Sequence, residues 1–276
     1  MRSVLARANR DVLEQFAWSN VLLAFDYDGT LAPIVSDRER AAMRPTTRRL
    51  LKELTKLYPC IVISGRAQAD ATERLRGVTL HQIIGNHGVE PWQATRRFKR
   101  EVEGWRPVLE HRLASHRGVV IEDKVFSVAV HYRRSREKKK ARSAILQAAS
   151  SLGDVRVIGG KLVVNILPRD APHKGLALMR ERERFRCDTA IYLGDDETDE
   201  DVFAMDQPGR LLSIRVGKKR NSHATYYVDR QADVDVLLQR LKGLRLGLRA
   251  ATRRTPQAEP LLVGRRVPSA PRKVAR

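Results

Sequence analysis

The chain has 276 residues, of which 42% are apolar and 31% charged, a composition typical of a folded, soluble protein and not of a disordered one. Its two cysteines, Cys60 and Cys187, are too few and too far apart for a disulfide framework or a cysteine zinc site, and they fit a reducing compartment. Lys and Arg outnumber Asp and Glu by 53 to 32, so the formal charge of +21 raises the question of an anionic partner.

The first 90 residues alternate between helical patterns and short apolar runs. Residues 1–18 have the spacing of an amphipathic helix, a second helix is predicted from Pro45 to Leu57, and a third after Arg66. The apolar runs predict buried strands over residues 21–25, 60–63 and 83–84. Strands that alternate with helices predict a parallel, Rossmann-like α/β sheet.

The middle of the chain has a different pattern. Helical spacing is found over residues 101–116 and 136–151. Strands are predicted over residues 119–121, 125–131, 155–158 and 162–166. Together these elements predict an α+β cap inserted into the core. The segment is also strongly basic, because residues 91–160 contain 16 Lys and Arg against 7 Asp and Glu.

The parallel pattern then resumes. A helix is predicted over residues 173–185, followed by strands over 190–193 and 211–216 and a last helix over 232–246. We therefore expect a core in two parts, a cap and a tail, with boundaries at 1–90, 91–160, 161–248 and 249–276. The tail contains 8 Lys and Arg against 1 acidic residue, with four prolines, as is typical of a disordered extension. A solvated tail is the simpler interpretation, and binding of nucleic acid or anionic lipid is the alternative.

The sequence indicates neither export nor a membrane anchor. The first apolar run ends at Asp26 and is too short for the core of a signal peptide. Every other apolar run falls short of the ~18 residues that a membrane span needs. We expect a cytoplasmic protein with no membrane association, acting as a monomer.

The first polar cluster, Asp26-Tyr27-Asp28-Gly29-Thr30, follows a predicted strand. Side chains alternate along an extended chain, so Asp26 and Asp28 point the same way. One aspartate can attack a phosphorus atom, while the other protonates the leaving alkoxide and then activates water. A calcium loop also begins with this pattern, but it would favour Asp or Asn at Thr30 and flanking helices.

Two further clusters are suited to phosphate. Ser64-Gly65-Arg66 lies at a strand-to-helix junction, where hydroxyl and backbone N–H groups can donate to phosphate oxygens, although Ser-Gly is also an ordinary helix start. Lys174 is predicted at the first turn of a helix, where the macrodipole disfavours a cation unless an anion lies nearby. A solvated lysine is the simpler interpretation of that residue.

The fourth cluster is Gly194-Asp195-Asp196-Glu197-Thr198-Asp199-Glu200-Asp201. So many acids directly after an apolar strand repel one another unless a cation is present, and oxygen ligands suit Mg²⁺. An acidic first helical turn explains Glu200 and Asp201, but it explains Asp195 poorly. In open α/β sheets ligands bind outside the carboxyl ends of the strands, so the four clusters can meet in one crevice.

Taken together, DYDGT, SGR, the lysine of HKG and GDDETDED resemble the four motifs of the haloacid-dehalogenase-like (HAD) phosphatases. The longer runs DYDGTLAPI, GNHGVE and GDDETDED are similar to trehalose-6-phosphate phosphatases, over roughly residues 15–245. The resemblance implies Mg²⁺-dependent hydrolysis of trehalose 6-phosphate, with Asp26 as nucleophile, Asp28 as acid/base and Lys174 as a third catalytic residue. Metal ligands would be Asp26, the Asp28 carbonyl and Asp195, while Asp196 and Asp199 would support the metal and Lys174.

Substrate contacts are expected from both parts of the chain. In the core they are expected from Thr30, Ser64, Gly65, Arg66 and His87. In the cap they are expected from Glu122, Lys124, His131, Arg133 and Asn165, although polar residues on a hairpin are often only solvated. The family usually carries a Glu and an Arg in the run before the lysine motif, where this chain has Asn165 and Leu167. This departure leaves the phosphatase chemistry intact and puts the sugar preference in question.

Two alternatives remain open. One is a phosphatase for another sugar phosphate, such as a glucosylglycerol phosphate, and the cap residues would decide between the substrates. The other is a nucleic-acid-binding or regulatory protein that uses its basic surface. Aromatic residues make up only 5% of the chain, which leaves few for base stacking and makes nucleic acid a weaker expectation than a small phosphate ester.

Overall fold

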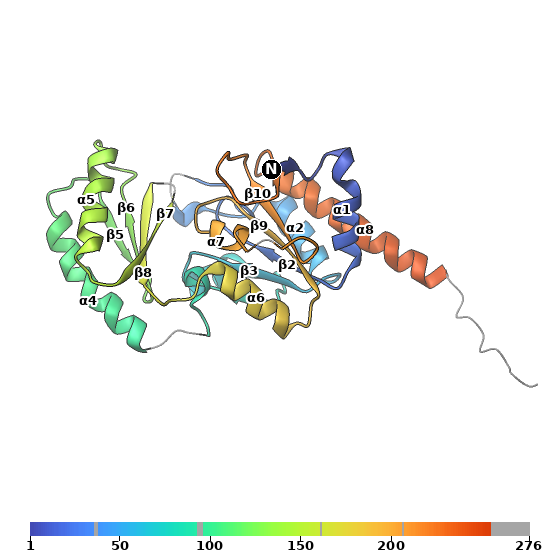
Figure 1. Ribbon diagram of the computed structural model, residues 1–276, viewed down its shortest axis with the longest axis horizontal. Helices are drawn as coiled ribbons and strands as arrows, with labels where there is room; N and C mark the ends of the chain where they lie inside the picture. The colour runs from blue at the N-terminus through green and yellow to red at the C-terminus, as the bar shows by residue number, and fades with distance from the viewer. Residues whose placement is uncertain (36–37, 93–95, 161, 206, 255–276) are drawn as a thin grey trace, which may run out of the picture.

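The computed structural model describes residues 1–254 apart from 36–37, 93–95, 161 and 206 (Figure 1). Within this part of the chain, seven parallel strands form the core sheet. Their order across the sheet is β1 (Arg2–Ser3), β11 (Tyr226–Val228), β10 (Leu211–Val216), β9 (Thr189–Gly194), β2 (Val21–Phe25), β3 (Cys60–Ile63) and β4 (Gln82–Ile84). This confirms the predicted parallel α/β core.

Helices cover both faces of this sheet. One face packs against α1 (Arg10–Trp18), α2 (Pro45–Leu54) and α8 (Asp233–Arg254), and the other against α6 (Lys174–Arg184) and α7 (Glu200–Phe203). The short helix α3 (Gln68–Arg74) connects β3 to β4. Strand β2 is apolar throughout because Val21, Leu23 and Phe25 enter one apolar cluster while Leu22 and Ala24 enter the other.

The inserted cap is a separate layered unit at the opposite end of the molecule from α8 (Figure 1). Its described residues form a four-stranded antiparallel sheet in the order β5 (Val120–Asp123), β6 (Val128–His131), β8 (Val163–Pro168) and β7 (Val155–Gly160). Helices α4 (Arg96–Leu113) and α5 (Lys138–Ser150) pack against one face through Trp105, Ile145 and their neighbours. The other face is turned toward the core, and it carries the predicted sugar contacts.

The N-terminal helix is shorter than predicted. Residues 2–3 instead form an edge strand, in which Arg2 N–H donates to Thr225 O and Val4 N–H to Tyr227 O, each at 3.0 Å. Its partner β11 was not predicted, because three residues are too short a run to show a period. Burial of Val4 against the core stabilises the strand, so the helical spacing of residues 1–18 is overridden by tertiary packing.

Two predicted boundaries also differ from the structure. The boundary at residue 160 falls between β7 and β8, which pair with each other, so the cap sheet continues to Pro168. Helix α8 continues to Arg254, and the rest of the predicted tail, residues 255–276, lies outside the described residues. Within the described ranges, the helices lack the combination of length and apolar character that a membrane crossing requires.

Candidate active site

A cavity of about 430 Å³ lies between the core and the cap, within the range of ~300–1,000 Å³ typical of small-molecule sites. The core contributes residues that follow β2, β3 and β9, because the carboxyl ends of parallel strands meet at one edge of the sheet. The polar residues that it contributes are Asp26, Asp28, Glu39, His87, Lys174, Asp195, Asp196 and Thr198. The cavity therefore joins residues from all four clusters, although Thr30, Ser64, Arg66 and Asp199 are not among the described residues that border it.

Lys174 is buried at the first turn of α6, between two carboxylates. Its ammonium donates to Asp26 Oδ1 and to Asp199 Oδ1, both at 2.8 Å. Burial favours the neutral amine, but the charges of Asp199 and Asp26 outweigh it and raise the pKa of Lys174 well above its ordinary value. Lys174 is therefore a permanent cation beside Asp26, and the solvated lysine considered above is excluded.

Asp199 is the residue that fixes this arrangement. Its Oδ1 accepts from Lys174 and from the Tyr192 hydroxyl, the latter at 2.6 Å. Its Oδ2 accepts from the backbone N–H groups of Asp195 and Asp196, at 2.8 and 3.0 Å. Burial raises the pKa of Asp199, but Lys174 and the other donors outweigh burial, so that its pKa is lowered overall. The carboxylate is thus ionised and saturated with donors, which suits support of Lys174 and of the loop after β9.

Oxygen atoms that could hold a cation gather beside Lys174. Ligand atoms of Asp26, Asp195 and Asp199 all lie within 4.8 Å of one another. Asp195 Oδ1 is buried and lacks a hydrogen-bond partner among the described residues. Burial, and then the charges of Asp26 and Asp196, raise the pKa of Asp195 well above its ordinary value, so a cation is needed to keep the cluster ionised. Because Asp199 is already saturated, Asp26 and Asp195 are the side chains that fit a hard divalent metal.

Glycines hold these loops close together. A Cβ atom on Gly29, which has a φ of +87°, would lie 2.2 Å from Asp195 Oδ2. The same atom on Gly194 would lie 2.2 Å from Asp199 Cγ. Any side chain at either position would push the carboxylates apart, which explains the glycine in both motifs.

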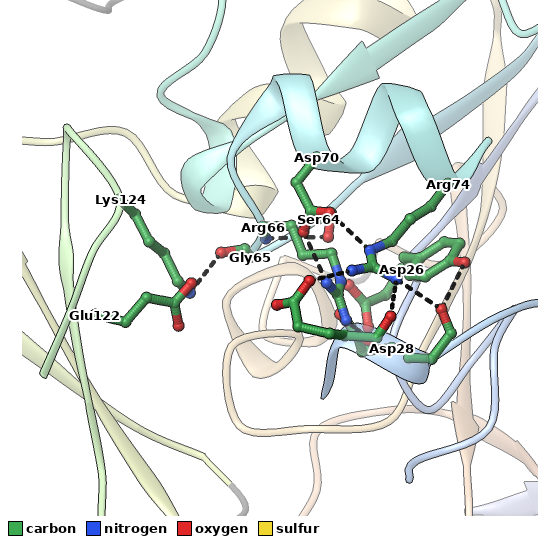
Figure 2. Close-up of polar contacts among 12 residues, drawn as sticks. Asp26, Asp28, Ser64, Gly65, Arg66, Asp70, Arg74, Glu122 and Lys124 are labelled. Carbon is green, nitrogen blue, oxygen red and sulfur yellow. Dashed lines mark hydrogen bonds and ion pairs between the residues drawn. The ribbon is translucent and has the colours of Figure 1, made fainter. Parts of the chain in front are cut away.

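Asp28 does not touch Lys174 but forms a bidentate ion pair with Arg66 (Figure 2). Arg66 Nε and Nη2 donate to its two carboxylate oxygens, at 2.6 and 2.7 Å. The remaining nitrogen, Nη1, donates to Asp70 at 2.7 Å. The side chain of Arg66 is 0% exposed, whereas that of Asp28 is 37% exposed and borders the cavity.

The other predicted core contacts divide into two groups. Gly65 and His87 border the cavity, and a Cβ atom on Gly65 would lie 2.5 Å from His87 Cε1. Thr30, Ser64 and Arg66 are fully buried and are not among the described residues that border it. Ser64 Oγ accepts from the backbone N–H of Arg66 at 3.1 Å, so in this conformation it shapes the turn.

The cap places its five predicted residues on the cavity: Glu122, Lys124, His131, Arg133 and Asn165. His131 Nε2 lies 2.7 Å from Glu122 Oε2. Two of these side chains also reach across to the core: Lys124 Nζ donates to Gly65 O at 2.8 Å, and Arg133 Nη1 donates to Val35 O at 2.9 Å. Figure 2 shows Lys124 extending from the cap to Gly65, so the two lobes meet around the cavity.

The two residues that depart from the family pattern lie in different surroundings. Asn165 borders the cavity. Leu167 is buried in an apolar cluster with Val89, Phe98 and Ala171, at the junction of the two lobes. Leu167 therefore packs inside the junction, and of the two residues only Asn165 is among those that border the cavity.

Several contributing residues were not predicted. Tyr192 lies within the strand predicted over residues 190–193, and its hydroxyl donates to Asp199. Arg215 donates to the backbone carbonyls of Asp195 and Asp196 and pairs with Glu200 at 2.8 Å. An arginine inside the apolar run of β10 is a signal that could have been used, because a buried charge needs a partner. Glu39 and Arg134 also border the cavity.

Comparisons with known proteins agree with this geometry. The trehalose-phosphatase family model matches residues 24–232. A probable trehalose-phosphate phosphatase of Arabidopsis thaliana is 28% identical over 258 residues, covering 84% of this chain and 72% of that protein. The trehalose-phosphate phosphatase of Mycobacterium marinum is 34% identical over 207 residues, covering 69% of this chain and 53% of that protein.

The fold is shared with solved structures. The C-terminal domain of C. albicans trehalose-6-phosphate phosphatase matches with a TM-score of 0.70 at 23% identity. The match covers 85% of this chain and 97% of that domain. The core motifs, the inserted cap and the extent of the family match lead to one assignment: the chain is a phosphatase with a HAD-type core and belongs to the trehalose-phosphatase family.

Proposed function

We propose that this phosphatase hydrolyses trehalose 6-phosphate to trehalose and inorganic phosphate, with Mg²⁺ as its cofactor. The observation that carries the proposal is the shared cavity. On its core side the cavity presents Asp26 bonded to a permanently charged Lys174, and on its cap side it presents groups that can bond sugar hydroxyls. A phosphate ester of a polyhydroxylated leaving group matches both halves.

In the first step Asp26 attacks phosphorus. A bond forms between its carboxylate oxygen and phosphorus, and the bond from phosphorus to the sugar oxygen breaks. Lys174, 2.8 Å from Asp26 Oδ1, draws the phosphoryl oxygens toward the nucleophile. Asp28, on the same strand extension, gives a proton to the departing sugar oxygen.

In the second step water replaces the sugar. Asp28, now a carboxylate, accepts a proton from that water, whose oxygen attacks phosphorus and releases Asp26 as a free carboxylate. Asp26, the Asp28 carbonyl and Asp195 would hold Mg²⁺, which would supply positive charge to offset that of the phosphoryl oxygens. Asp199 and Tyr192 keep Lys174 and the loop after β9 in place throughout.

The cap is proposed to select the sugar. Glu122, His131 and Asn165 combine acceptor and donor groups on the cavity wall, while Lys124 and Arg133 bridge to the core. A site that bonds substrate hydroxyls rejects analogues that lack them, because buried polar groups are then left unpaired. The cytoplasmic location and the monomeric state expected from the sequence stay predictions.

The deciding experiment is a phosphate-release screen across sugar phosphates in the presence of Mg²⁺. We expect kcat/KM for trehalose 6-phosphate to exceed that for glucose 6-phosphate by ~100-fold or more, since the second glucose unit adds contacts to the cap. Equal values for the two esters would overturn the assignment. Preferential release from a glucosylglycerol phosphate would support the alternative that Asn165 raises.

A further inference from the structure

We propose that Arg66 is a positioning residue for the acid/base Asp28, and that Asp70 and Arg74 hold Arg66 in place. This inference rests on the proposed mechanism, because it assigns Arg66 a task only if Asp28 transfers protons. It replaces the expectation that Arg66 binds substrate, since the buried guanidinium does not border the cavity among the described residues.

The contacts of Arg66 and Arg74 form a continuous series of ion pairs (Figure 2). Arg66 binds Asp28 through Nε and Nη2, and Asp70 Oδ2 through Nη1 at 2.7 Å. Arg74 Nε donates to the other oxygen of Asp70, also at 2.7 Å. Arg66 thus bridges Asp28 and Asp70, and Asp70 bridges Arg66 and Arg74, whose side chains are 0% and 12% exposed.

This series of ion pairs ends at the border of the cavity. Arg74 Nη1 donates to the carbonyls of Glu39 and Ala41, at 3.1 and 3.0 Å, and Arg74 Nη2 lies 2.9 Å from the Glu39 carboxylate. Glu39 and Ala41 border the cavity, as Asp28 does. The network therefore fixes Asp28 from behind and anchors one wall of the cavity at the same time.

A planar guanidinium is required by this geometry. Two parallel N–H groups must face both oxygens of Asp28 while a third faces Asp70, and a lysine ammonium cannot reproduce that fork. The Tyr27 ring, 5.7 Å from the guanidinium carbon, limits its movement on another side. This fork fixes the direction in which the Asp28 carboxyl group faces the cavity.

The test compares two leaving groups. An alkoxide leaves slowly without a proton, whereas p-nitrophenolate is a stable anion that needs little help from a general acid. Misplacing Asp28 should therefore reduce kcat/KM for sugar phosphates much more than for p-nitrophenyl phosphate. Loss of a phosphate contact, or of local folding, would reduce both equally.

We would measure Arg66→Lys on p-nitrophenyl phosphate and on the sugar phosphate that the wild-type chain hydrolyses best. We expect ~100-fold lower kcat/KM for the sugar phosphate and a change within ~3-fold for the aryl ester, in the range of general acid–base catalysis. KM for the sugar phosphate should stay within ~2-fold. The matched control is Arg76→Lys, since the side chain of Arg76 is exposed and forms an ion pair with the exposed Glu73; it should change neither value.

A second variant tests whether misfolding explains the loss of activity in Arg66→Lys. Asp70 has a side chain 35% exposed, so Asp70→Asn removes the charge behind Arg66 at a partly solvated position. We expect ~10-fold lower kcat/KM for the sugar phosphate and again little change for the aryl ester. Equal losses on both esters, or a rise in KM alone, would overturn the inference.

The outcome separates this inference from the proposed function. If the best substrate is a sugar phosphate other than trehalose 6-phosphate, the proposed substrate is wrong, and the Arg66 comparison is made on that ester. If the wild-type chain releases no phosphate from any ester, both are overturned. If trehalose 6-phosphate is preferred but Arg66→Lys loses both esters equally, only the inference is wrong.

Discussion

The core and cap sides of the cavity hold their functional groups in different ways. In the core, Asp26, Lys174, Asp199 and Tyr192 are all buried and bonded to one another at 2.6–2.8 Å. In the cap, the side chains of Glu122 and His131 are each about one-third exposed and meet in a single 2.7 Å contact. The core groups are fixed by one another, while Glu122 and His131 remain partly open to solvent.

This difference separates chemistry from selection. Groups that act on phosphorus must be aligned before the substrate arrives. The alignment gained from the buried hydrogen-bond network therefore offsets the free energy of removing its charged groups from water. Groups that bond sugar hydroxyls can adjust on binding, and the partly exposed Glu122 and His131 on a separate lobe allow that. Substitutions in the core should therefore lower kcat, and substitutions in the cap should raise KM.

The largest effect is expected from Asp26→Asn. An amide cannot form the acyl phosphate, so kcat should fall by at least ~10⁴-fold, as for other nucleophile replacements. The amide oxygen can still accept from Lys174, so thermal unfolding should show a folded chain. Asp11→Asn, at an exposed position on α1, is the control and should leave kcat unchanged. Near-normal turnover by Asp26→Asn would exclude this nucleophile.

Metal removal should give the second-largest loss of activity. Without a bound metal ion, the carboxylates of Asp26 and Asp195 repel a phosphate dianion. Chelation with EDTA should therefore lower phosphate release by ~100-fold or more. Added Mg²⁺ should restore it and should also raise the midpoint of thermal unfolding, because it binds only the folded chain. Full activity in EDTA together with an unchanged midpoint would argue against a metal at these aspartates.

Tyr192→Phe tests the network without touching the reacting groups. It removes the 2.6 Å hydrogen bond to Asp199, a buried bond to a charged group, so urea unfolding should show a loss of ~1.5–3 kcal/mol in the free energy of unfolding. We expect kcat to fall by ~10-fold or less, since Lys174 still binds both carboxylates. Tyr227→Phe on β11, half-buried, should cost less than ~0.5 kcal/mol. A similar loss in both variants would mean that the network is not cooperative.

On the cap side, Glu122→Gln should raise KM for the sugar phosphate by ~10-fold, about 1.4 kcal/mol, with kcat within ~2-fold. The reason is that Glu122 borders the cavity but lies in the other lobe from the reacting groups. Glu103→Gln, on an exposed ion pair of α4, supplies the control and should change neither constant. A fall in kcat at unchanged KM would place Glu122 in the chemistry and erase the contrast between the lobes.

The smallest effect is expected from ending the chain at Arg254, which removes residues 255–276. Every described residue that borders the cavity is retained, so phosphate release should stay within ~2-fold of the full chain. A parallel filter-binding measurement with duplex DNA at several salt concentrations would detect a role of the basic segment in polyanion binding. Loss of phosphate release on shortening would contradict a catalytic unit contained in residues 1–254.

Much of the fold and site could be predicted because its signals are local. Strand-end motifs such as Asp26 to Thr30 combine an apolar run with a polar turn, and parallel strands bring such turns together. The burial of a polar side chain was not predictable in the same way. Arg66 has the residue type of a phosphate ligand, but its burial and its two carboxylate partners appear only in the folded chain. Tyr192 went unnoticed because an aromatic residue in an apolar run is usually core.

The continuity of β8 with α6 has a consequence for exchanging caps between relatives. Strand β8 carries Asn165 on the cap sheet, and the chain reaches Lys174 only six residues after Pro168. A chimaera joined at residue 160 would take β7 from one parent and β8 from the other, and would break the pairing between them. A junction after Pro168 keeps the sheet whole, so the transferable unit for altered sugar preference includes the strand that leads into the catalytic lysine.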